Sequence, residues 1–427
     1  MFAFTQVILL LLVLVSGHSD EAVAETGVYS ISGMESAVPD NDLMPLKSLA
    51  LGAEVIALGE SSHGSEGFHR ARYHVLKFMV EKMGVRAIAF EHPWAHTIQA
   101  GEFVNTCEGS SLEAVRDFSM YIWKSVANRE LLDWLCAFNK EHPRDKVAFF
   151  GFDIQKQSVR DFQRVKKTLA MLSEVNTNNI TGDISQCFGA QYASDEELSS
   201  SQELRNIFGP SPTPTNEIKH QHCLRGIGLA RNVLLDYLNR EQGSVKIRLA
   251  LVAANTLEGF ENQIYLLSRK HLRESSALRD RLMASTFLDL RSIFAPGKRT
   301  AIWAHGYHIA KGFDFYPVPP GFRPNKVMGM YLEDYFGSRY WNMDLWGYEV
   351  QVNWPGQEDP SVPTSNEVVT KILHDKGISA AILDSRTSFV KDQKYKTWSD
   401  EDPLFDIPKH FDAVLYLDRS PKMVPIK

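Results

Sequence analysis

The chain has 427 residues, more than one ordinary domain, so it can bury a large core, and we expect one large domain with an insertion or two domains. Its 52 acidic and 46 basic side chains leave a formal net charge of -6, a mild acidic balance that argues against a nucleic-acid partner. The four cysteines have no Cys-x-x-Cys spacing, which excludes the usual zinc-finger patterns.

The chain begins with the features of an export signal. Residues 7–15 are all apolar, Ser16 and Gly17 follow, and the small-x-small stretch Ala22-Val23-Ala24 lies beyond. Such a run is too short to span a bilayer but is typical of a signal-peptide core; a buried strand or an anchor is the alternative. We therefore predict that residues 1–24 are a signal peptide and that the mature protein is secreted or periplasmic, without stable membrane insertion. Loss of Asp20 and Glu21 with this segment changes the net charge from -6 to -4.

Export would place the cysteines in an oxidising compartment. Two disulfides are then expected, most simply Cys107 with Cys136 and Cys187 with Cys223, although four cysteines allow three pairings. Buried free thiols are the alternative.

The first predicted strand stops at a carboxylate and a histidine. After Glu54, residues 55–58 are all aliphatic. Gly59 ends this run, and Glu60 and His63 follow. Ligands of open α/β sheets bind at such carboxyl ends. Residues 66–83 have helical period, with Arg72 inside the apolar stripe. A buried guanidinium needs a carboxylate partner, and Glu60 and Glu91 are the candidates.

Two further predicted strands also end at an acid. Residues 85–90 lead to Glu91, and residues 146–150 lead to Asp153, with helices predicted at 99–105, 112–123 and 128–141 between them. A helix N-cap would explain Asp153 alone. Glu60 and Glu91 together, beside an arginine, indicate a functional site.

Long helices are predicted from residue 158 onward, at 221–240, 246–269 and 275–294. The polar stretch 176–215 is expected to be a surface excursion or lid margin rather than core. This block predicts a helical insertion that covers the strand ends and shapes the substrate cleft. On its last helix, Arg279-Asp280-Arg281 is typical of a solvated charged face.

The last third of the chain completes the predicted sheet. Residues 300–304 form a strand followed by His305-Gly306-Tyr307-His308. A lone histidine at a strand end is usually a core residue, but His305 is the second one, and a parallel sheet brings such ends to one edge. Helices at 326–336 and 365–376 and strands at 340–352, 379–383 and 413–417 follow.

The predicted fold class is α/β, with a mostly parallel central sheet flanked by helices and a large helical insertion covering the carboxyl ends of the strands. The expected segments are a signal peptide at 1–24, the first half of the core at 25–157, the insertion at 158–298 and the second half of the core at 299–427.

Several spaced motifs resemble the erythromycin esterase family of hydrolases, over about residues 51–417. The motifs are Gly59-Glu60-x-x-His63-Gly64 with Arg72, Glu91, Gly151-Phe152-Asp153, Arg279-Asp280 with Met283, and Trp303-Ala304-His305 with His308. The resemblance implies an esterase that acts on macrolide lactones, and hence a role in antibiotic resistance. It also implies that Arg279 and Asp280 line the cleft.

The residues themselves favour hydrolysis by activated water. No Gly-x-Ser-x-Gly elbow, phosphate-binding loop or Rossmann fingerprint is present, and Ser61 and Ser62 are weak nucleophile candidates. In our hypothesis His63 is the general base and His305 protonates or polarises the ester, without a covalent intermediate.

The remaining roles follow from the same hypothesis. Glu60 or Glu91 orients His63, and Arg72 holds the carboxylates. The candidate substrate-binding residues are His308, Arg279, Asp280, Trp94, Tyr307 and Asp153. Aromatic side chains near the strand ends, including Phe313, suggest a cleft for a bulky ester or lactone, so a small molecule is the expected partner and no cofactor is expected.

Two alternative hypotheses about function use the same candidate histidines and carboxylates. Two or three histidines with one or two carboxylates could hold zinc or manganese and generate a hydroxide, although Arg72 already supplies a counter-charge there. The non-enzymatic alternative is an exported protein that binds haem or a metal through its histidines, an idea based on fold analogy alone.

Overall fold

The structure is a computed structural model. It describes residues 27–34, 38–155, 159–172, 177–192, 195–208, 211, 213–241, 243–312, 324–352, 368–391, 393–395 and 405–426. The predicted signal peptide and Phe313 lie outside these residues.

The strands form a mixed sheet of eight strands, in the order β1-β7-β10-β6-β2-β5-β3-β4, and a separate pair, β8-β9. Their bounds are β1 Val28–Ser30, β2 Val55–Leu58, β3 Val85–Pro93, β4 Ala148–Asp153, β5 Arg299–Trp303, β6 Tyr340–Val350, β7 Ala380–Asp384, β8 Lys394–Tyr395, β9 Phe405–Asp406 and β10 Ala413–Ser420. Neighbours from β10 to β4 are parallel, whereas β7 is antiparallel to both β1 and β10. The predicted mostly parallel α/β fold is confirmed, with an antiparallel edge that we did not predict.

The α-helices before the insertion are α2 Asp40–Leu43, α3 Pro45–Leu49, α4 Glu66–Met83, α5 Ile98–Thr106, α6 Ser111–Arg116 and α7 Val126–Glu141. Those of the insertion are α8 Val159–Met171, α9 Asn178–Ile184, α10 Asp195–Ser200, α11 Gln202–Phe208, α12 Glu217–Arg240, α13 Val245–Ser268 and α14 Leu272–Phe294. The last group is α15 Gly306–Ile309, α16 Met328–Phe336, α17 Val369–Asp375 and α18 Ser388–Lys391. The single helix predicted over 112–123 is wrong, because α6 ends at Arg116 and a short 3₁₀ helix follows at Tyr121–Trp123.

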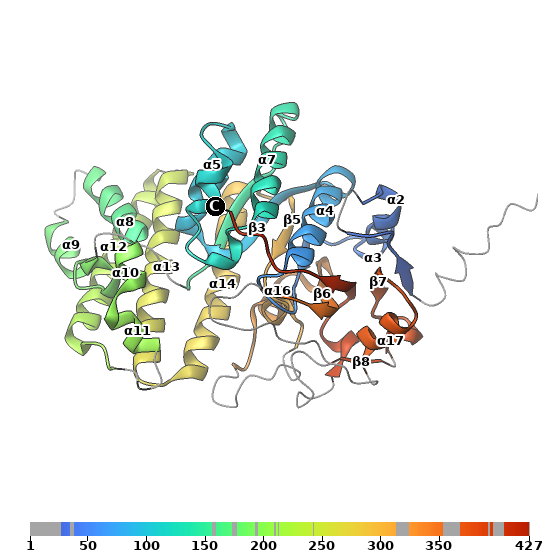
Figure 1. Ribbon diagram of the computed structural model, residues 1–427. Coiled ribbons are helices and arrows are strands. Elements are labelled where there is room, and N and C mark those ends of the chain that lie inside the picture. Colours follow the sequence, from blue (N-terminus) through green and yellow to red (C-terminus); the bar gives the residue numbers. More distant parts are fainter. Residues whose placement is uncertain are drawn as a thin grey trace, which may run out of the picture.

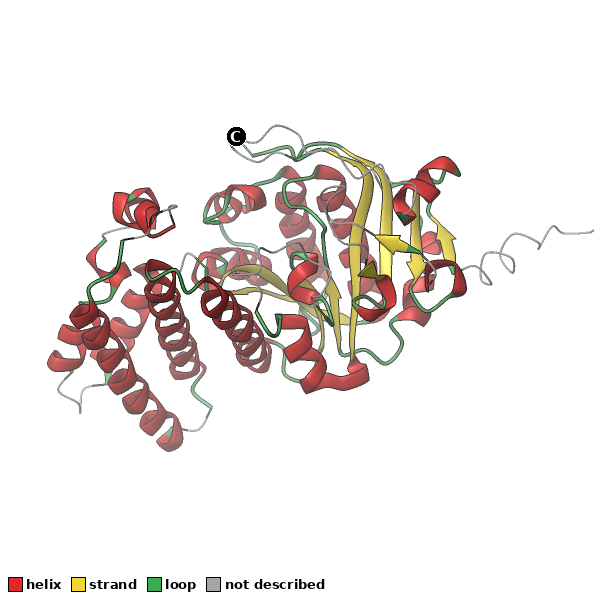
Figure 2. Cartoon of the chain, turned by 90° about the horizontal axis from the view of Figure 1, so that it is seen from below, coloured by secondary structure: helices red, strands yellow, loops and turns green. Residues whose placement is uncertain are grey.

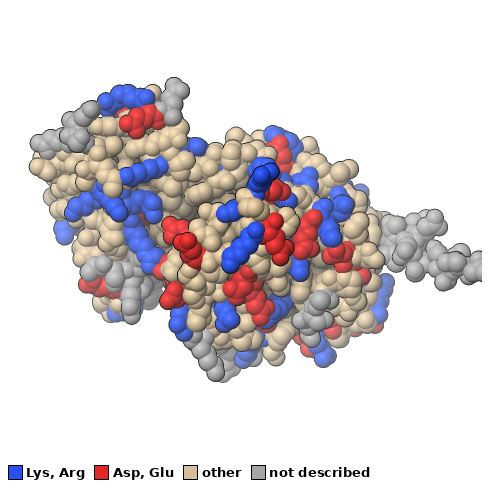
Figure 3. Space-filling model, turned by 90° about the horizontal axis from the view of Figure 1, so that it is seen from above, with Lys and Arg blue, Asp and Glu red and all other residues tan. Residues whose placement is uncertain are grey.

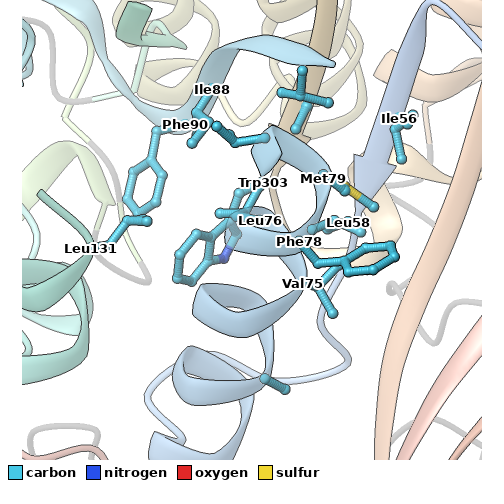
Figure 4. Close-up of a cluster of buried hydrophobic side chains, with 14 of the residues drawn as sticks. Ile56, Leu58, Val75, Leu76, Phe78, Met79, Ile88, Phe90, Leu131 and Trp303 are labelled. Carbon is cyan, nitrogen blue, oxygen red and sulfur yellow. The ribbon is translucent and has the colours of Figure 1, made fainter. Parts of the chain in front are cut away.

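The core lies on both faces of the sheet, because successive strand residues point to opposite faces. In β2, Val55 and Ala57 join the buried cluster on the side of the insertion, while Ile56 and Leu58 join the other cluster. Figure 4 shows part of this second cluster, where α4 packs its apolar side chains against β2, β3 and β5.

Helix α4 has the bounds that its apolar periodicity predicts. It ends at Gly84, whose φ of 70° is left-handed and therefore suits glycine, and whose N–H donates to the carbonyl of Met79. The stripe that faces the core includes Arg72, whose side chain is completely buried.

The helices of the insertion lie side by side to the left of β3 in Figure 1, and Figure 2 shows them at one end of the molecule, apart from most strands. Helix α14 also contacts β4 and reaches the strand ends. The exact boundaries at 158 and 298 stay a prediction.

The stretch 176–215 differs from its prediction. Its described residues include the short helices α9, α10 and α11, and Leu198 and Leu204 are buried against Phe260 of α13 in a small separate core cluster. The expectation of a surface excursion without core is therefore wrong. Widely spaced apolar residues are enough to bury one side of a short helix, even in a polar segment.

Both predicted disulfides are confirmed. Cys107 and Cys136 connect the end of α5 to α7, with Cα atoms 5.3 Å apart. Cys187 and Cys223 connect the segment after α9 to α12, with Cα atoms 4.7 Å apart.

No helix among the described residues is long and apolar enough to cross a membrane. On the face seen in Figure 3, acidic and basic side chains are interspersed over the part of the molecule that carries the sheet. That part of this face presents mixed charge rather than a continuous basic patch.

Candidate active site

The carboxyl ends of four adjacent parallel strands carry the polar cluster. β2 leads to Glu60, β3 contains Glu91, β4 ends at Asp153 and β5 leads to His305. The backbone N–H of His305 donates to Glu91 Oε2 at 2.6 Å, and that of Gly306 donates to the carbonyl of Glu60 at 2.8 Å. The sheet thus brings these segments into direct contact.

Glu60 is the partner of both His63 and Arg72. Its Oε1 lies 2.6 Å from His63 Nδ1, and its Oε2 forms an ion pair with Arg72 Nη2. Glu60 and Arg72 are fully buried, and the Arg72 guanidinium lies 3.7 Å from the centre of the Trp303 ring. This cation–π contact and the ion pair together stabilise a charge that water cannot reach.

The imidazole of His63 is oriented from several sides. Its ring packs edge-on against Trp123 and His305, with centroids 5.3 Å and 4.8 Å away. Since Glu60 is a carboxylate, Nδ1–H donates to it and Nε2 keeps the basic lone pair. Burial lowers the pKa of His63 and Arg279 adds to this, whereas Glu91 and Asp153 oppose it. The net lowering favours a neutral imidazole at neutral pH.

Arg279 joins two of the strand ends. Its Nε and Nη2 donate to the two carboxylate oxygens of Asp153 at 3.0 and 2.8 Å, and Nη2 also donates to Glu91 Oε1 at 2.9 Å. Burial would raise the pKa of both acids, but it is outweighed at Asp153 mainly by Arg279 and at Glu91 by His308, His63 and Arg279. Both pKa values therefore lie below their ordinary range, and the acids are ionised.

Asp280 and Arg279 both face this cluster, as the family resemblance implied, so the solvated face of α14 that the charge spacing alone favoured is wrong for these two residues. Asp280 is fully buried, and its Oδ1 lies 2.7 Å from His308 Nδ1. His308 Nε2 lies 2.9 Å from Arg279 Nη1, which can only donate. The implied tautomer of His308 is neutral, with Nδ1–H donating to Asp280.

His305 has the opposite tautomer. It caps α15, and its Nδ1 accepts a hydrogen bond from the backbone N–H of Tyr307 at 3.2 Å. The proton of neutral His305 is therefore on Nε2, where it can be donated. Burial, with the neighbouring His63, His308 and Arg279, lowers the pKa of His305 well below its ordinary value.

The other candidates divide between two places. The Tyr307 ring lies 5.1 Å from that of His308 and is mostly buried beside the cluster. Trp94 lines a different cavity with Arg164, and no residue of the strand-end cluster lines it. Asp153 is not the cap of α8, which begins at Val159; its Oδ1 accepts the N–H groups of the two residues that follow it.

Asp344 is a buried acid beside the cluster that the sequence patterns did not identify. It lies on β6, where it follows Met343, the parallel partner of Leu58 in β2. A Cβ atom at Gly59 or at Gly306 would overlap its carboxylate, so Asp344 packs against the backbone of both loops that carry the cluster. Burial raises the pKa of Asp344 to about 7, against the opposing effects of Trp346, the Leu345 N–H and Arg72. An aspartate between the apolar residues Met343 and Leu345 of a predicted strand was the available signal.

The carboxylates that could bind a metal ion in this cluster are already paired with arginines. The carboxylates of Glu60, Glu91 and Asp153 already accept hydrogen bonds from Arg72 and Arg279. Among the described residues, the group whose ligand atoms lie close enough together to hold one metal ion consists of Cys187, Cys223 and Glu261. Its two cysteines form a disulfide with each other. The geometry of the cluster is that of an arginine–carboxylate–histidine network.

The chain is similar to known proteins over most of its length. Residues 80–420 match the sequence model of the erythromycin esterase family. A putative hydrolase of Bacillus subtilis, YbfO, is 22% identical over 65% of this chain, and the chain spans 60% of that relative's length. Erythromycin esterase type II of Escherichia coli is 24% identical, with 72% of each chain covered.

Two solved structures share the fold. A succinoglycan biosynthesis protein superposes with a TM-score of 0.71 at 16% identity, covering 95% of this chain and 98% of its own. A mutant of erythromycin esterase EreC in its open conformation superposes with a TM-score of 0.62 at 16% identity, covering 90% of this chain and 95% of its own. At these identities the likeness concerns the fold alone.

Proposed function

Because the chain belongs to the erythromycin esterase family of hydrolases, we propose that it cleaves a carboxylic ester or lactone with water that His63 activates. The observation that carries this proposal is the 2.6 Å contact between His63 Nδ1 and Glu60 Oε1. The same carboxylate also forms a buried ion pair with Arg72. A carboxylate that holds the tautomer and orientation of an imidazole is what a general base requires.

The proposed reaction is a direct attack of water on the ester carbonyl. His63 Nε2 takes a proton from water, and the water oxygen forms a bond to the carbonyl carbon. The carbonyl oxygen gains negative charge, which the Nε2–H of His305 and the charge of Arg279 stabilise. When the carbon–oxygen ester bond breaks, the proton on His63 passes to the leaving alkoxide, and a carboxylic acid and an alcohol result.

The substrate proposal is a bulky small-molecule ester or lactone, and the proposed location is secreted or periplasmic. Erythromycin esterase type II of Escherichia coli, the relative that is 24% identical, carries an activity of this kind in its name. The apolar run at residues 7–15 supports export.

The test is hydrolysis of erythromycin and of an aryl ester by the native protein and by His63→Ala. General-base catalysis contributes about 10²-fold or more, so kcat/KM should fall by at least about that factor. His222→Ala is the matched control, because this histidine also bonds to a carboxylate, Asp183, but lies on α12. Its activity should equal that of the native protein.

Two further arms separate the competing mechanisms. Ser61→Ala and Ser62→Ala should remain active, because the proposed nucleophile is water. The Ser62 hydroxyl, moreover, donates to the backbone carbonyl of His63. Activity should also survive a chelator. Loss of activity in a serine variant, or loss to the chelator with recovery on adding zinc or manganese, would contradict the proposal, as would no hydrolysis of either ester.

A further inference from the structure

A cavity of about 350 Å³ lies beside β4, between the sheet and the insertion. Its walls come from α5 and β4 on one side and from α8, α13 and α14 on the other. The apolar residues that line it are Trp94, Ile98, Val147, Ala148, Phe149, Leu249 and Phe294. Phe294 is 40% exposed. This volume and lining are typical of a small-molecule site.

The open edge of β4 does not favour an added peptide strand. The N–H and carbonyl of Val147 bond to the side chain of Asn139, at 2.7 and 2.9 Å. The N–H of Gly151 donates to Thr97 Oγ1 at 2.7 Å. Side chains of the protein thus already occupy backbone groups just before this strand and within it, and a compact ligand fits the cavity better than an extended chain.

The charges at the cavity favour an anion. Arg164 and Lys146 line it, against one acidic side chain, Glu102. The Arg164 guanidinium lies 4.9 Å from the centre of the Trp94 ring, and in the described residues no carboxylate pairs with it. Lys146 donates to Asn105 instead. A guanidinium stacked on an aromatic ring keeps its donors available for a carboxylate.

We propose that this cavity is a second ligand site, which binds an organic monocarboxylate with its apolar body in the cavity and its carboxylate on Arg164. Binding there is independent of hydrolysis at the strand ends. Trp94 belongs to this site rather than to the cluster around His63.

The experiment compares 2-naphthoate with uncharged 2-naphthamide by isothermal titration calorimetry on the full chain. A charged hydrogen bond predicts that naphthoate binds about tenfold more tightly. Arg164→Gln should remove this preference and leave the affinity for naphthamide unchanged. Leu249→Trp should fill the cavity and weaken the binding of both compounds.

Arg160→Gln is the matched control, because Arg160 is also on α8 but pairs with Asp117. It should keep the preference for naphthoate. Equal binding of the two compounds, or an unchanged preference in Arg164→Gln, would overturn the proposal. Naphthoate binding that Arg279→Met abolishes and Arg164→Gln does not affect would assign the anion to the strand ends instead. Because Arg164 is partly exposed, this comparison remains decisive even where Leu249→Trp fails to fold.

Discussion

Replacing Asp344 by asparagine is expected to flatten the pH dependence of stability. Asp344 is buried between the backbones of Gly59 and Gly306, and burial raises its pKa from 3.8 to about 7. Between these two values the folded protein holds a proton on this carboxyl that the unfolded chain has released. The free energy of unfolding therefore decreases as the pH rises through this window.

The size of this decrease in the free energy of unfolding follows from the raised pKa of Asp344. One pKa unit corresponds to about 1.4 kcal/mol, so the part of the window between pH 5 and pH 7 amounts to about 3 kcal/mol. Asparagine cannot ionise, so the free energy of unfolding of the Asp344→Asn variant lacks this decrease. Asparagine also loses an acceptor, because Trp346 Nε1–H and the Leu345 N–H donate to different oxygens of Asp344. That cost of about 1–3 kcal/mol applies at both pH values and cancels in the comparison.

The assay is urea unfolding of the native protein and Asp344→Asn at pH 5 and pH 8. The native protein should lose about 3 kcal/mol more between these pH values than the variant does. Asp133→Asn is the control, because Asp133 is about half exposed on α7 and its pH dependence should match that of the native protein. Equal pH dependence in Asp344→Asn and the native protein would refute the reasoning, because it would mean that Asp344 is ionised throughout.

Three further outcomes are expected. Arg279→Met should destabilise the fold by about 3–5 kcal/mol in urea unfolding, because it leaves two buried acids without their cation, and a change below about 1 kcal/mol would contradict the buried network. The acid limb of a pH profile of kcat/KM should have its midpoint below 6.5, because the pKa of His63 is lowered, and a midpoint above 7 would argue against His63 as the base. Replacing both members of Cys187–Cys223 by alanine should cost about 2–4 kcal/mol in thermal unfolding, whereas unchanged stability would mean that this crosslink constrains the unfolded chain little.

The sequence alone was enough to predict that the candidate residues gather at one edge of the sheet. Apolar runs that stop at Glu60, Glu91 and His305 identify buried strands and the residues at their carboxyl ends. A mostly parallel sheet then requires these ends to meet at one edge, whatever the details of packing. The helical period around Arg72 likewise required a buried carboxylate partner, because an arginine cannot lose its charge inside a protein.

Only the tertiary structure decided which partners meet. Glu60 rather than Glu91 pairs with Arg72, and Arg279 and Asp280 face inward because of how α14 packs on β4. Trp94 follows Glu91 closely in the sequence, yet its side chain enters a different cavity. Periodicity gives the direction of a side chain relative to its own helix or strand. The registers and helix orientations that decide its contacts depend on packing between segments far apart in the chain, which a local pattern does not encode.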